Sequence, residues 1–249
     1  MPVKISISNQ KGGVGKTDLT VNLSASLASL GKNVLLIDID PQANSTDYLI
    51  KRDDQPTIVD LLTKDNVNVE DVILKTEFQN LSIIPASIRL SVLQVQLSNE
   101  VNMQFRLRRK LKALDDFDYV FIDTPPSLGL LTVNALTASD RVIIPVQTHY
   151  FAMDGVSKLV DTVSTIREDL NPNLKIAGIV LTMYDRRTSL SKEVEEKVRG
   201  AFKGRVFQTI IPTNIKLAES PSHHSPIAVY SPSSSGAKAY LDLAREFLS

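Results

Sequence analysis

The feature that most constrains this chain is a glycine-rich segment near its start. Residues 9–18 read Asn-Gln-Lys-Gly-Gly-Val-Gly-Lys-Thr-Asp, directly after the apolar run Val3 to Ser8. Gly12, Gly13 and Gly15 can adopt backbone angles that side chains forbid, so the N–H groups of the turn can converge on phosphate oxygens. The helix expected to follow adds the positive end of its dipole at the same place. The segment therefore predicts a phosphate-binding loop between a strand and a helix.

Two lysines and a threonine complete this loop. Lys16 is expected to reach the β and γ phosphates of a nucleotide, and Thr17 to offer its hydroxyl to Mg²⁺. The general loop pattern also calls for a glycine where Gln10 stands, so that pattern is only partly matched. The additional lysine, Lys11, has no such role within its own chain. Its presence predicts a site that a second subunit completes.

The composition limits the remaining possibilities. A chain of 249 residues with 43% apolar content can bury one substantial core, so we expect a single domain over residues 1–249. Lys plus Arg equals Asp plus Glu, 28 against 28, so nucleic-acid binding would need a local basic patch. The absence of cysteine excludes disulfides and cysteine-held iron–sulfur clusters. No apolar stretch approaches ~18 residues and no secretory signal is visible, so we expect a cytoplasmic protein without a membrane span.

Apolar runs alternate with helical patterns along the chain. Continuous runs such as Val34-Leu35-Leu36-Ile37 indicate strands buried on both faces. The alternation predicts an α/β fold, with a doubly wound, mostly parallel sheet and helices on both faces. The expected strands are Lys4 to Ser8, Asn33 to Asp38, Leu81 to Pro85, Tyr119 to Asp123, Arg141 to Val146, Ile176 to Thr182 and Val206 to Ile211. The expected helices are Lys16 to Leu30, Asn102 to Leu114, Ala152 to Leu170, Ser191 to Phe202 and Gly236 to Leu248, with short helices and loops over residues 45–80.

Two of the expected strands end in aspartate. Ile37-Asp38-Ile39-Asp40 closes the second strand, and alternation places Asp38 and Asp40 on the same side of an extended segment. Four apolar residues precede Asp123, a pattern that commonly places a carboxylate near nucleotide-bound Mg²⁺. Ligands of doubly wound sheets bind beyond the carboxyl ends of the strands. We therefore expect these carboxylates beside the phosphate loop.

Together these segments closely resemble the ParA family of P-loop ATPases, in the group whose deviant Walker-type loop carries a signature lysine. The loop matches at Lys11-Gly-Gly-Val-Gly-Lys-Thr, the segment after the second strand at Asp38-Ile-Asp-Pro-Gln-Ala-Asn-Ser-Thr, and the third motif at Asp123-Thr-Pro-Pro-Ser. Shorter segments that also look like ParA are Pro145-Val-Gln, Tyr150-Phe-Ala-Met, Leu181-Thr-Met, Ile211-Pro-Thr-Asn and Ser220-Pro-Ser-His. The resemblance covers nearly the whole chain.

The resemblance implies roles for individual positions in binding and hydrolysing ATP. Lys16 would bind the β and γ phosphates, Lys11 would reach the partner's nucleotide across an ATP-sandwiched dimer, and Asp40 would position the attacking water. Mg²⁺ would lie near Thr17, Asp38 and Asp123. The residues implied to contact the nucleotide are Lys11, Gly12, Gly13, Val14, Gly15, Lys16, Thr17 and Asp18 in the loop, and Met183, Pro212 and Asn214 at the adenine.

The resemblance also implies a function and partners. ParA-type ATPases form an ATP-dependent homodimer, bind non-specific double-stranded DNA of the nucleoid, and drive plasmid or chromosome partition or cargo positioning. A ParB-like or other adaptor stimulates their hydrolysis. Arg187 and Lys216, with Arg186 beside them, match positions where such dimers place basic residues against DNA phosphates. A cation supplied by the partner subunit would link nucleotide state to dimerisation, and a dimer with two weak patches gains avidity.

Several positions depart from the family pattern. Asp18 stands where relatives usually have threonine or serine near the α-phosphate. A carboxylate facing inward would repel the nucleotide, whereas one facing outward suits the first helical turn, and we expect the outward orientation. Thr213, Ser233 and Ser235 occupy positions where relatives often carry arginine, which thins the expected DNA patch.

Three other functions compete with this interpretation. A MinD-like positioning ATPase that acts without DNA would need a basic amphipathic tail for a membrane, whereas the apolar residues of Ala239 to Leu248 indicate a docking face. A metabolic enzyme on the same fold is a second alternative: the missing cysteines exclude a reductase iron protein, and an ATP-using ligase or synthetase would leave Lys11 without a role. A nucleotide switch with impaired hydrolysis is the third, because Asp18 could weaken the site.

Overall fold

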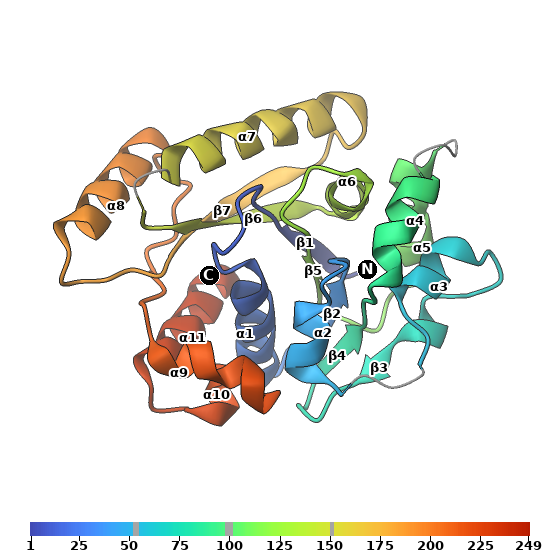
Figure 1. The fold of residues 1–249 in the computed structure, drawn as a ribbon, viewed down its shortest axis with the longest axis horizontal. Helices are drawn as coiled ribbons and strands as arrows, with labels where there is room; N and C mark the ends of the chain where they lie inside the picture. Colours follow the sequence, from blue (N-terminus) through green and yellow to red (C-terminus); the bar gives the residue numbers. More distant parts are fainter. Residues whose placement is uncertain (52–54, 98–101, 150–151) are drawn as a thin grey trace.

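The computed structural model describes residues 1–51, 55–97, 102–149 and 152–249 (Figure 1). Its centre is a sheet of seven strands in the order β3-β4-β2-β5-β1-β6-β7. All neighbouring strands are parallel except β3, which pairs antiparallel with β4 at one edge. The strands are β1 (Val3–Ile7), β2 (Val34–Asp38), β3 (Leu74–Lys75), β4 (Leu81–Ile84), β5 (Tyr119–Asp123), β6 (Arg141–Gln147) and β7 (Lys175–Thr182).

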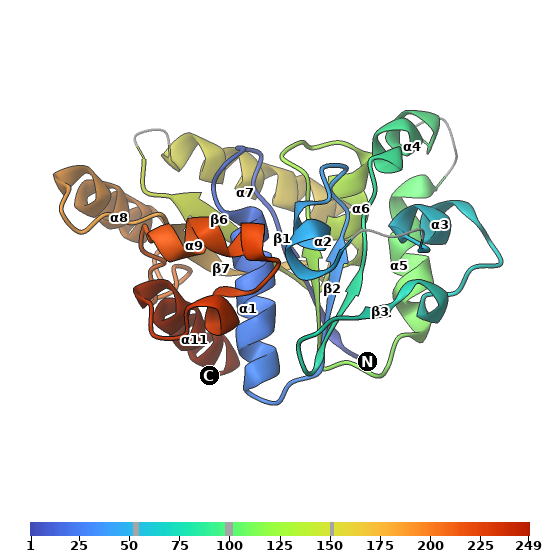
Figure 2. The same cartoon turned by 60° about the horizontal axis from the view of Figure 1, so that its bottom comes forward.

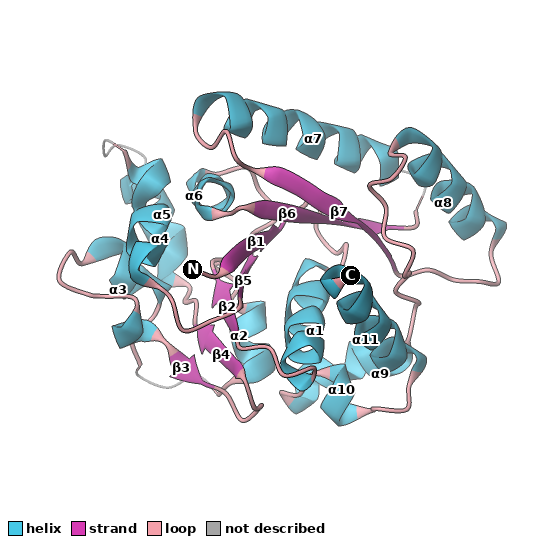
Figure 3. Ribbon diagram, turned by 180° about the vertical axis from the view of Figure 1, so that it is seen from behind, coloured by secondary structure: helices cyan, strands magenta, loops and turns pink. Residues whose placement is uncertain are grey.

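Helices cover both faces of the sheet, as Figure 3 shows from behind, which confirms the predicted fold class. One face packs against α1 (Lys16–Ser29), α2 (Asn44–Leu49), α9 (Ile215–Glu219), α10 (Ile227–Tyr230) and α11 (Ser235–Leu248). The other packs against α3 (Ile58–Thr63), α4 (Arg89–Leu97), α5 (Arg106–Lys110), α6 (Leu130–Ala138), α7 (Ala152–Asp169) and α8 (Ser189–Ala201). Within the described part of the chain, no helix is both long and apolar enough to cross a membrane.

The side-chain alternation of β2 explains why its sequence is apolar throughout. Val34 and Leu36 belong to the core on the α1 face, whereas Leu35 and Ile37 belong to the core on the opposite face. Both faces of this central strand are therefore buried. Burial of each such side chain contributes roughly 1.5–3 kcal/mol to the free energy of folding. Because the parallel strands end at the same edge, Asp38 of β2 lies in register beside Asp123 of β5.

The helix α11 packs against α1 beside the sheet (Figure 2), and its Phe247 ring also contacts Tyr119 and Phe121 of β5, with ring centroids 5.4 and 5.9 Å apart. Its buried residues Tyr240, Leu243 and Ala244 lie in the same core as Leu19 and Leu23 of α1. The apolar face recognised at the end of the sequence is thus an internal docking face, as predicted.

One predicted strand is wrong. Val206 to Ile211 runs beside β7 without forming a continuous ladder: it makes an isolated bridge between Val206 and Ile179, and the Ile211 N–H donates to the Leu181 carbonyl at 2.9 Å. The N–H groups of Gln208 and Thr209 bond the Glu246 carboxylate of α11, at 2.6 and 2.8 Å, instead of a strand neighbour. At these two residues, the Glu246 side chain therefore takes the place of hydrogen bonds to a neighbouring strand.

The helices differ from the prediction in several further places, and α4, α9 and α10 were not predicted. The segment predicted as one helix from Asn102 to Leu114 consists of α5 flanked by 3₁₀ turns at Met103–Phe105 and Leu111–Ala113. The helix α6 was not predicted, because most of its residues are buried and apolar and its sequence lacks a polar side. The ParA-like segment beginning at Tyr150 lies partly outside the described residues.

Candidate nucleotide site

The phosphate loop joins β1 to α1, and two of its three glycines have a positive φ angle. Gly13 and Gly15 have φ angles of 71° and 83°, which favour glycine, whereas Gly12 does not adopt this conformation. Hydrogen bonds to β6 and β7 hold the loop in place. The Thr182 hydroxyl of β7 donates to the Val14 carbonyl at 2.9 Å, and Asn9 Nδ2 donates to the Pro145 carbonyl at 2.7 Å.

Lys16 and Lys11 have opposite environments. Lys16 is 7% exposed, and its ammonium donates to the Lys11 carbonyl at 3.1 Å. Burial lowers the pKa of Lys16, while the charges of Asp123 and Asp40 oppose that shift. Lys11 is partly exposed, and among the described residues its ammonium has no hydrogen-bonding or ionic partner, although both its main-chain groups are bonded. The loop therefore fixes the backbone of Lys11 and leaves its side chain available.

Asp123 accepts hydrogen bonds from three hydroxyls at the carboxyl end of β5. Thr17 donates to its Oδ2 at 2.9 Å, Ser45 to the same atom at 2.6 Å, and Thr20 to Oδ1 at 3.3 Å. Burial raises the pKa of Asp123, and the hydrogen bonds from Ser45 and Thr17 oppose that rise. Asp123 and Thr17 thus come together as predicted, and Ser45 and Thr20 join them without having been predicted.

Asp38 and Asp40 are linked at the end of β2. The fully buried Asp38 carboxylate accepts bonds from the Asp40 N–H at 3.0 Å, the Thr46 N–H at 2.9 Å and the Thr46 hydroxyl at 2.8 Å. Burial, and next the charge of Asp123, raise the pKa of Asp38. Asp40 follows the strand in a turn, where its Oδ1 accepts from the Gln42 N–H at 2.9 Å. Asp38 therefore supports the turn that presents Asp40.

The donor set around Thr17 fits nucleotide-bound Mg²⁺. Mg²⁺ usually takes one or two protein oxygens and fills its remaining positions with phosphates and water. Over the described ranges, no group of three or more His, Cys, Asp or Glu side chains is arranged to hold a metal ion. A hydroxyl at the loop, backed by the carboxylate of Asp123, is consistent with a metal that arrives with its nucleotide.

The residues expected at the adenine line one cavity of about 320 Å³ beside the loop. Met183, Pro212 and Asn214 form one part of its wall, and Gly15 lies on the loop side. Met183 has a φ of 52°, an uncommon conformation for a residue with a side chain, which is often found at functional sites. A volume of this order suits a small-molecule pocket.

The predicted orientation of Asp18 is wrong. Asp18 is partly buried and lines the same cavity as Met183 and Asn214, so its carboxylate faces inward. Burial, and next the charge of Asp123, raise its pKa to about 6. Because α1 packs against α11 and the sheet, the first turn of α1 faces the cavity rather than solvent.

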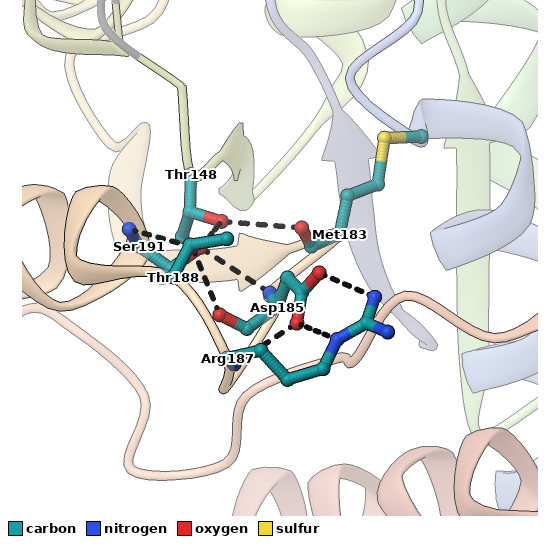
Figure 4. A network of polar contacts seen from close by, with 6 residues as sticks. All are labelled: Thr148, Met183, Asp185, Arg187, Thr188 and Ser191. Carbon is teal, nitrogen blue, oxygen red and sulfur yellow. Dashed lines mark hydrogen bonds and ion pairs between the residues drawn. The ribbon is translucent and has the colours of Figure 1, made fainter.

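The candidate DNA-contacting residues Arg186, Arg187 and Lys216 line a groove of about 1030 Å³, which adjoins the cavity because Pro212 and Asn214 line both. Arg187 pairs with Asp185 through two hydrogen bonds of 2.9 and 2.8 Å, as Figure 4 shows, and Asp185 is tied in turn to Ser191. Lys216 pairs with Glu219 at 2.8 Å. The groove also contains Lys238, which was not predicted because it lies in α11, far along the chain from the motifs.

The fold and the loop define the class of this protein: a P-loop nucleotide-binding protein with a second loop lysine. A family model described as AAA domain matches residues 3–176. The chain is 50% identical over 245 residues to the sporulation initiation inhibitor protein Soj of Bacillus subtilis, covering 97% of this chain and 96% of that protein. It is 47% identical over 247 residues to the chromosome partitioning protein ParA of Myxococcus xanthus, covering 98% and 87%. The chain belongs to the ParA/Soj family of ATPases.

A solved structure with a different activity in its name has the same fold. Cobyrinic acid a,c-diamide synthase of Mycobacterium smegmatis, bound to ADP and magnesium, matches with a TM-score of 0.86 and 34% identity, covering 100% of this chain and 94% of that one. Sequence identity to Soj and ParA is higher over a similar length. The comparison supports the partition proteins as the nearer model for function.

Proposed function

We propose that this chain is a nucleotide-controlled dimer switch that binds DNA in its ATP state. ATP hydrolysis and a part in chromosome partitioning follow from the family to which the chain belongs. The further steps of the proposal are an ATP-sandwiched homodimer, association with non-specific DNA of the nucleoid, and hydrolysis stimulated by a ParB-like or other adaptor.

The observation that carries the proposal is the contrast between the two loop lysines. Lys16 is buried in its own site, whereas Lys11 projects from a fixed backbone with its ammonium unpaired among the described residues. Transition states of phosphoryl transfer need added positive charge, which a partner subunit can supply. A second copy facing this loop would bring its own Lys11 to the phosphates.

The residues of one subunit divide the chemistry among them. Lys16 and the loop N–H groups hold the phosphates, and Thr17 with Asp123 supports Mg²⁺, which supplies charge neutralisation at the phosphate oxygens when bound. Asp40, oriented by its N–H bond to Asp38, positions the attacking water. Lys11 of the partner would stabilise the developing charge, so that hydrolysis requires the dimer.

Complementation between two inactive variants tests the site in trans. Lys11→Ala and Asp40→Ala are each expected to lose ATP hydrolysis while retaining nucleotide binding. In a mixed dimer, the subunit that carries Lys11→Ala still has Asp40 and receives an intact Lys11 from its partner. Mixing equal amounts should restore about a quarter of wild-type activity, because half of the random dimers are mixed and one of their two sites is complete.

The matched control is a mixture of Lys16→Ala with Asp40→Ala. Lys16 acts within its own subunit, so every mixed dimer then has one site without Lys16 and one without Asp40, and no activity should return. If the Lys11→Ala mixture stays as inactive as this control, Lys11 acts within its own subunit, which would contradict its assignment to the partner's site.

DNA binding is tested separately with a non-specific duplex, in ATP–Mg²⁺, in ADP and without nucleotide, at two salt concentrations. Salt-sensitive binding with ATP alone is expected, and Arg187→Ala or Lys216→Ala should weaken it. Arg141→Ala is the control, because Arg141 is exposed at the amino end of β6, away from the site edge of the sheet. ATP binding without DNA binding in any condition would overturn the DNA part of the proposal.

A further inference from the structure

The cavity beside the phosphate loop contains a carboxylate without a protein partner. Asp18 lies two residues after Lys16, in the first turn of α1, and lines the cavity together with Met183 and Asn214. Among the described residues, none donates a hydrogen bond to its carboxylate and no cation pairs with it; only its main-chain carbonyl is bonded, to Asn22 Nδ2 at 2.9 Å. Buried charged groups are normally paired or hydrogen-bonded, so this one lacks its expected donor.

Among the described residues, no other polar side chain of the cavity donates a hydrogen bond to Asp18. Tyr240 lies near enough for the charge of Asp18 to raise its pKa further, after burial, but no hydrogen bond joins the two side chains. Asn214 Nδ2 donates to the Ser235 hydroxyl at 2.7 Å, and its Oδ1 accepts from the Leu217 N–H at 3.2 Å. The Thr182 hydroxyl donates to the Val14 carbonyl at 2.9 Å. After burial, the charge that acts on Asp18 is that of another carboxylate, Asp123, which raises the pKa of Asp18 and supplies no donor. The Asp18 carboxylate is therefore available to accept a hydrogen bond from a ligand in the cavity.

The position of Asp18 indicates which part of a nucleotide would meet it. Its neighbour Thr17 is at the phosphate end, bonded to Asp123, whereas Met183 and Asn214 mark the base end of the cavity. The sugar of a nucleotide lies between its phosphates and its base. Ribose hydroxyls donate hydrogen bonds, and a carboxylate is a strong acceptor for them.

We propose that the Asp18 carboxylate accepts a hydrogen bond from a ribose hydroxyl of the bound nucleotide and thereby selects ribonucleotides over deoxyribonucleotides. This inference rests on the proposed function, because it assigns the cavity to the nucleoside of ATP. It makes Asp18 a specificity-determining residue rather than a residue that only weakens the site. The repulsion between the Asp18 carboxylate and the phosphates is then offset by the hydrogen bond from the ribose hydroxyl, which a deoxyribose cannot make.

The test measures dissociation constants for ATP, 2′-deoxyATP and 3′-deoxyATP, with Mg²⁺, for the wild type, Asp18→Ala and Asp18→Asn. The wild type should bind ATP about tenfold or more tightly than at least one deoxynucleotide, the range expected for one hydrogen bond to a charged group. Asp18→Ala should abolish that difference, and Asp18→Asn, which keeps an acceptor oxygen, should retain part of it. A thermal unfolding curve of each variant verifies that it is folded.

Three results would overturn the inference. Equal affinity of the wild type for ATP and both deoxynucleotides removes the selectivity itself, and a difference that persists in Asp18→Ala assigns it to another residue. The third arm uses purine riboside triphosphate, which lacks the 6-amino group: if Asp18→Ala changes discrimination against this analogue alone, the donor is the base and not the sugar. A wild type that binds none of these nucleotides would instead overturn the proposed function, and this inference with it.

Discussion

At the scale of single residues, the Asp123 carboxylate connects two helices of the site to the sheet. Its neighbours Thr17, Thr20 and Ser45 come from α1 and α2, so one side chain of β5 connects both elements. Asp38 and Asp123 could be placed together from the sequence, because adjacent parallel strands end at one edge. Ser45 and the inward side of Asp18 could not, because tertiary packing orients the helices that carry them.

Ser45→Ala should reduce both stability and hydrolysis. The hydroxyl of Ser45 donates to buried Asp123 Oδ2 at 2.6 Å, and a hydrogen bond to a charged group contributes roughly 1.5–3 kcal/mol. We expect a lower melting temperature and a higher Mg²⁺ concentration for half-maximal ATP hydrolysis. Ser29→Ala serves as the control, because within the described ranges its hydroxyl bonds the Ser26 carbonyl and no other group. Equal behaviour of the two variants would contradict a role for Ser45.

Asp60 gives a pH dependence away from the site. Burial raises its pKa, but hydrogen bonds from Lys64 and the Thr57 N–H, with the charges of Lys64 and Arg89, outweigh this and lower it to about 2. A carboxyl whose folded pKa lies below its unfolded value of 3.8 stabilises the fold above that value and loses the effect as the pH falls towards 2.

The measurement is the melting temperature of Asp60→Asn against pH. The variant should be less stable than the wild type at pH 6, and the difference should shrink between pH 4 and pH 2. Glu70→Gln is the control, since Glu70 is exposed and forms no ion pair within the described residues. A difference that stays constant over this pH range would show that the charge of Asp60 does not matter.

At the scale of elements, sequence patterns worked best for the strands and least well where contacts are remote. The run Val34 to Ile37 is apolar because both of its faces are buried, so its assignment needed only local information. The segment Val206 to Ile211 is apolar at both ends, yet the N–H groups of Gln208 and Thr209 in its middle bond Glu246 on α11. A local sequence pattern holds no information on a hydrogen-bonding partner that lies 37 or 38 residues away.

The packing of α11 against α9 gives an element-scale prediction. A Cβ placed on Gly236 would lie 2.7 Å from Leu217 Cγ, closer than real contacts allow. Gly236→Ala should therefore destabilise the protein by about 1–3 kcal/mol through overpacking. It should also weaken ATP binding, because Leu217 lines the cavity beside the loop.

The matched substitution is Gly200→Ala in α8, where a Cβ would meet nothing within 4 Å. Replacing a helical glycine by alanine at an open position is expected to stabilise by roughly 0.5–1 kcal/mol. Denaturant midpoints of the two variants should therefore move in opposite directions. Movement in the same direction would mean that the close approach of α9 and α11 is not a constraint.

At the scale of the whole molecule, the last helix belongs to the core that begins with the first strand. Ile5 and Ile7 of β1, Leu23 of α1 and Tyr240 and Leu243 of α11 form one buried cluster. A truncation after Ser234 should expose that face and abolish cooperative unfolding, as measured by circular dichroism. Deletion of Ser249 alone should leave the transition unchanged. A truncated chain that still melts cooperatively would show that the sheet is stable without α11.

The strand order also has a consequence for synthesis of the protein. β1 lies between β5 and β6, and Val3 pairs with Tyr119, so the strand that leads into the phosphate loop has no neighbour until much later residues have been made. The cavity further needs Asn214 and Tyr240. At about 5–20 residues per second, roughly 10–50 s separate the appearance of the loop from that of Tyr240 on the ribosome. Each new copy therefore becomes responsive to nucleotide only after Tyr240 has been made, which sets the earliest moment at which it can join the cellular pool.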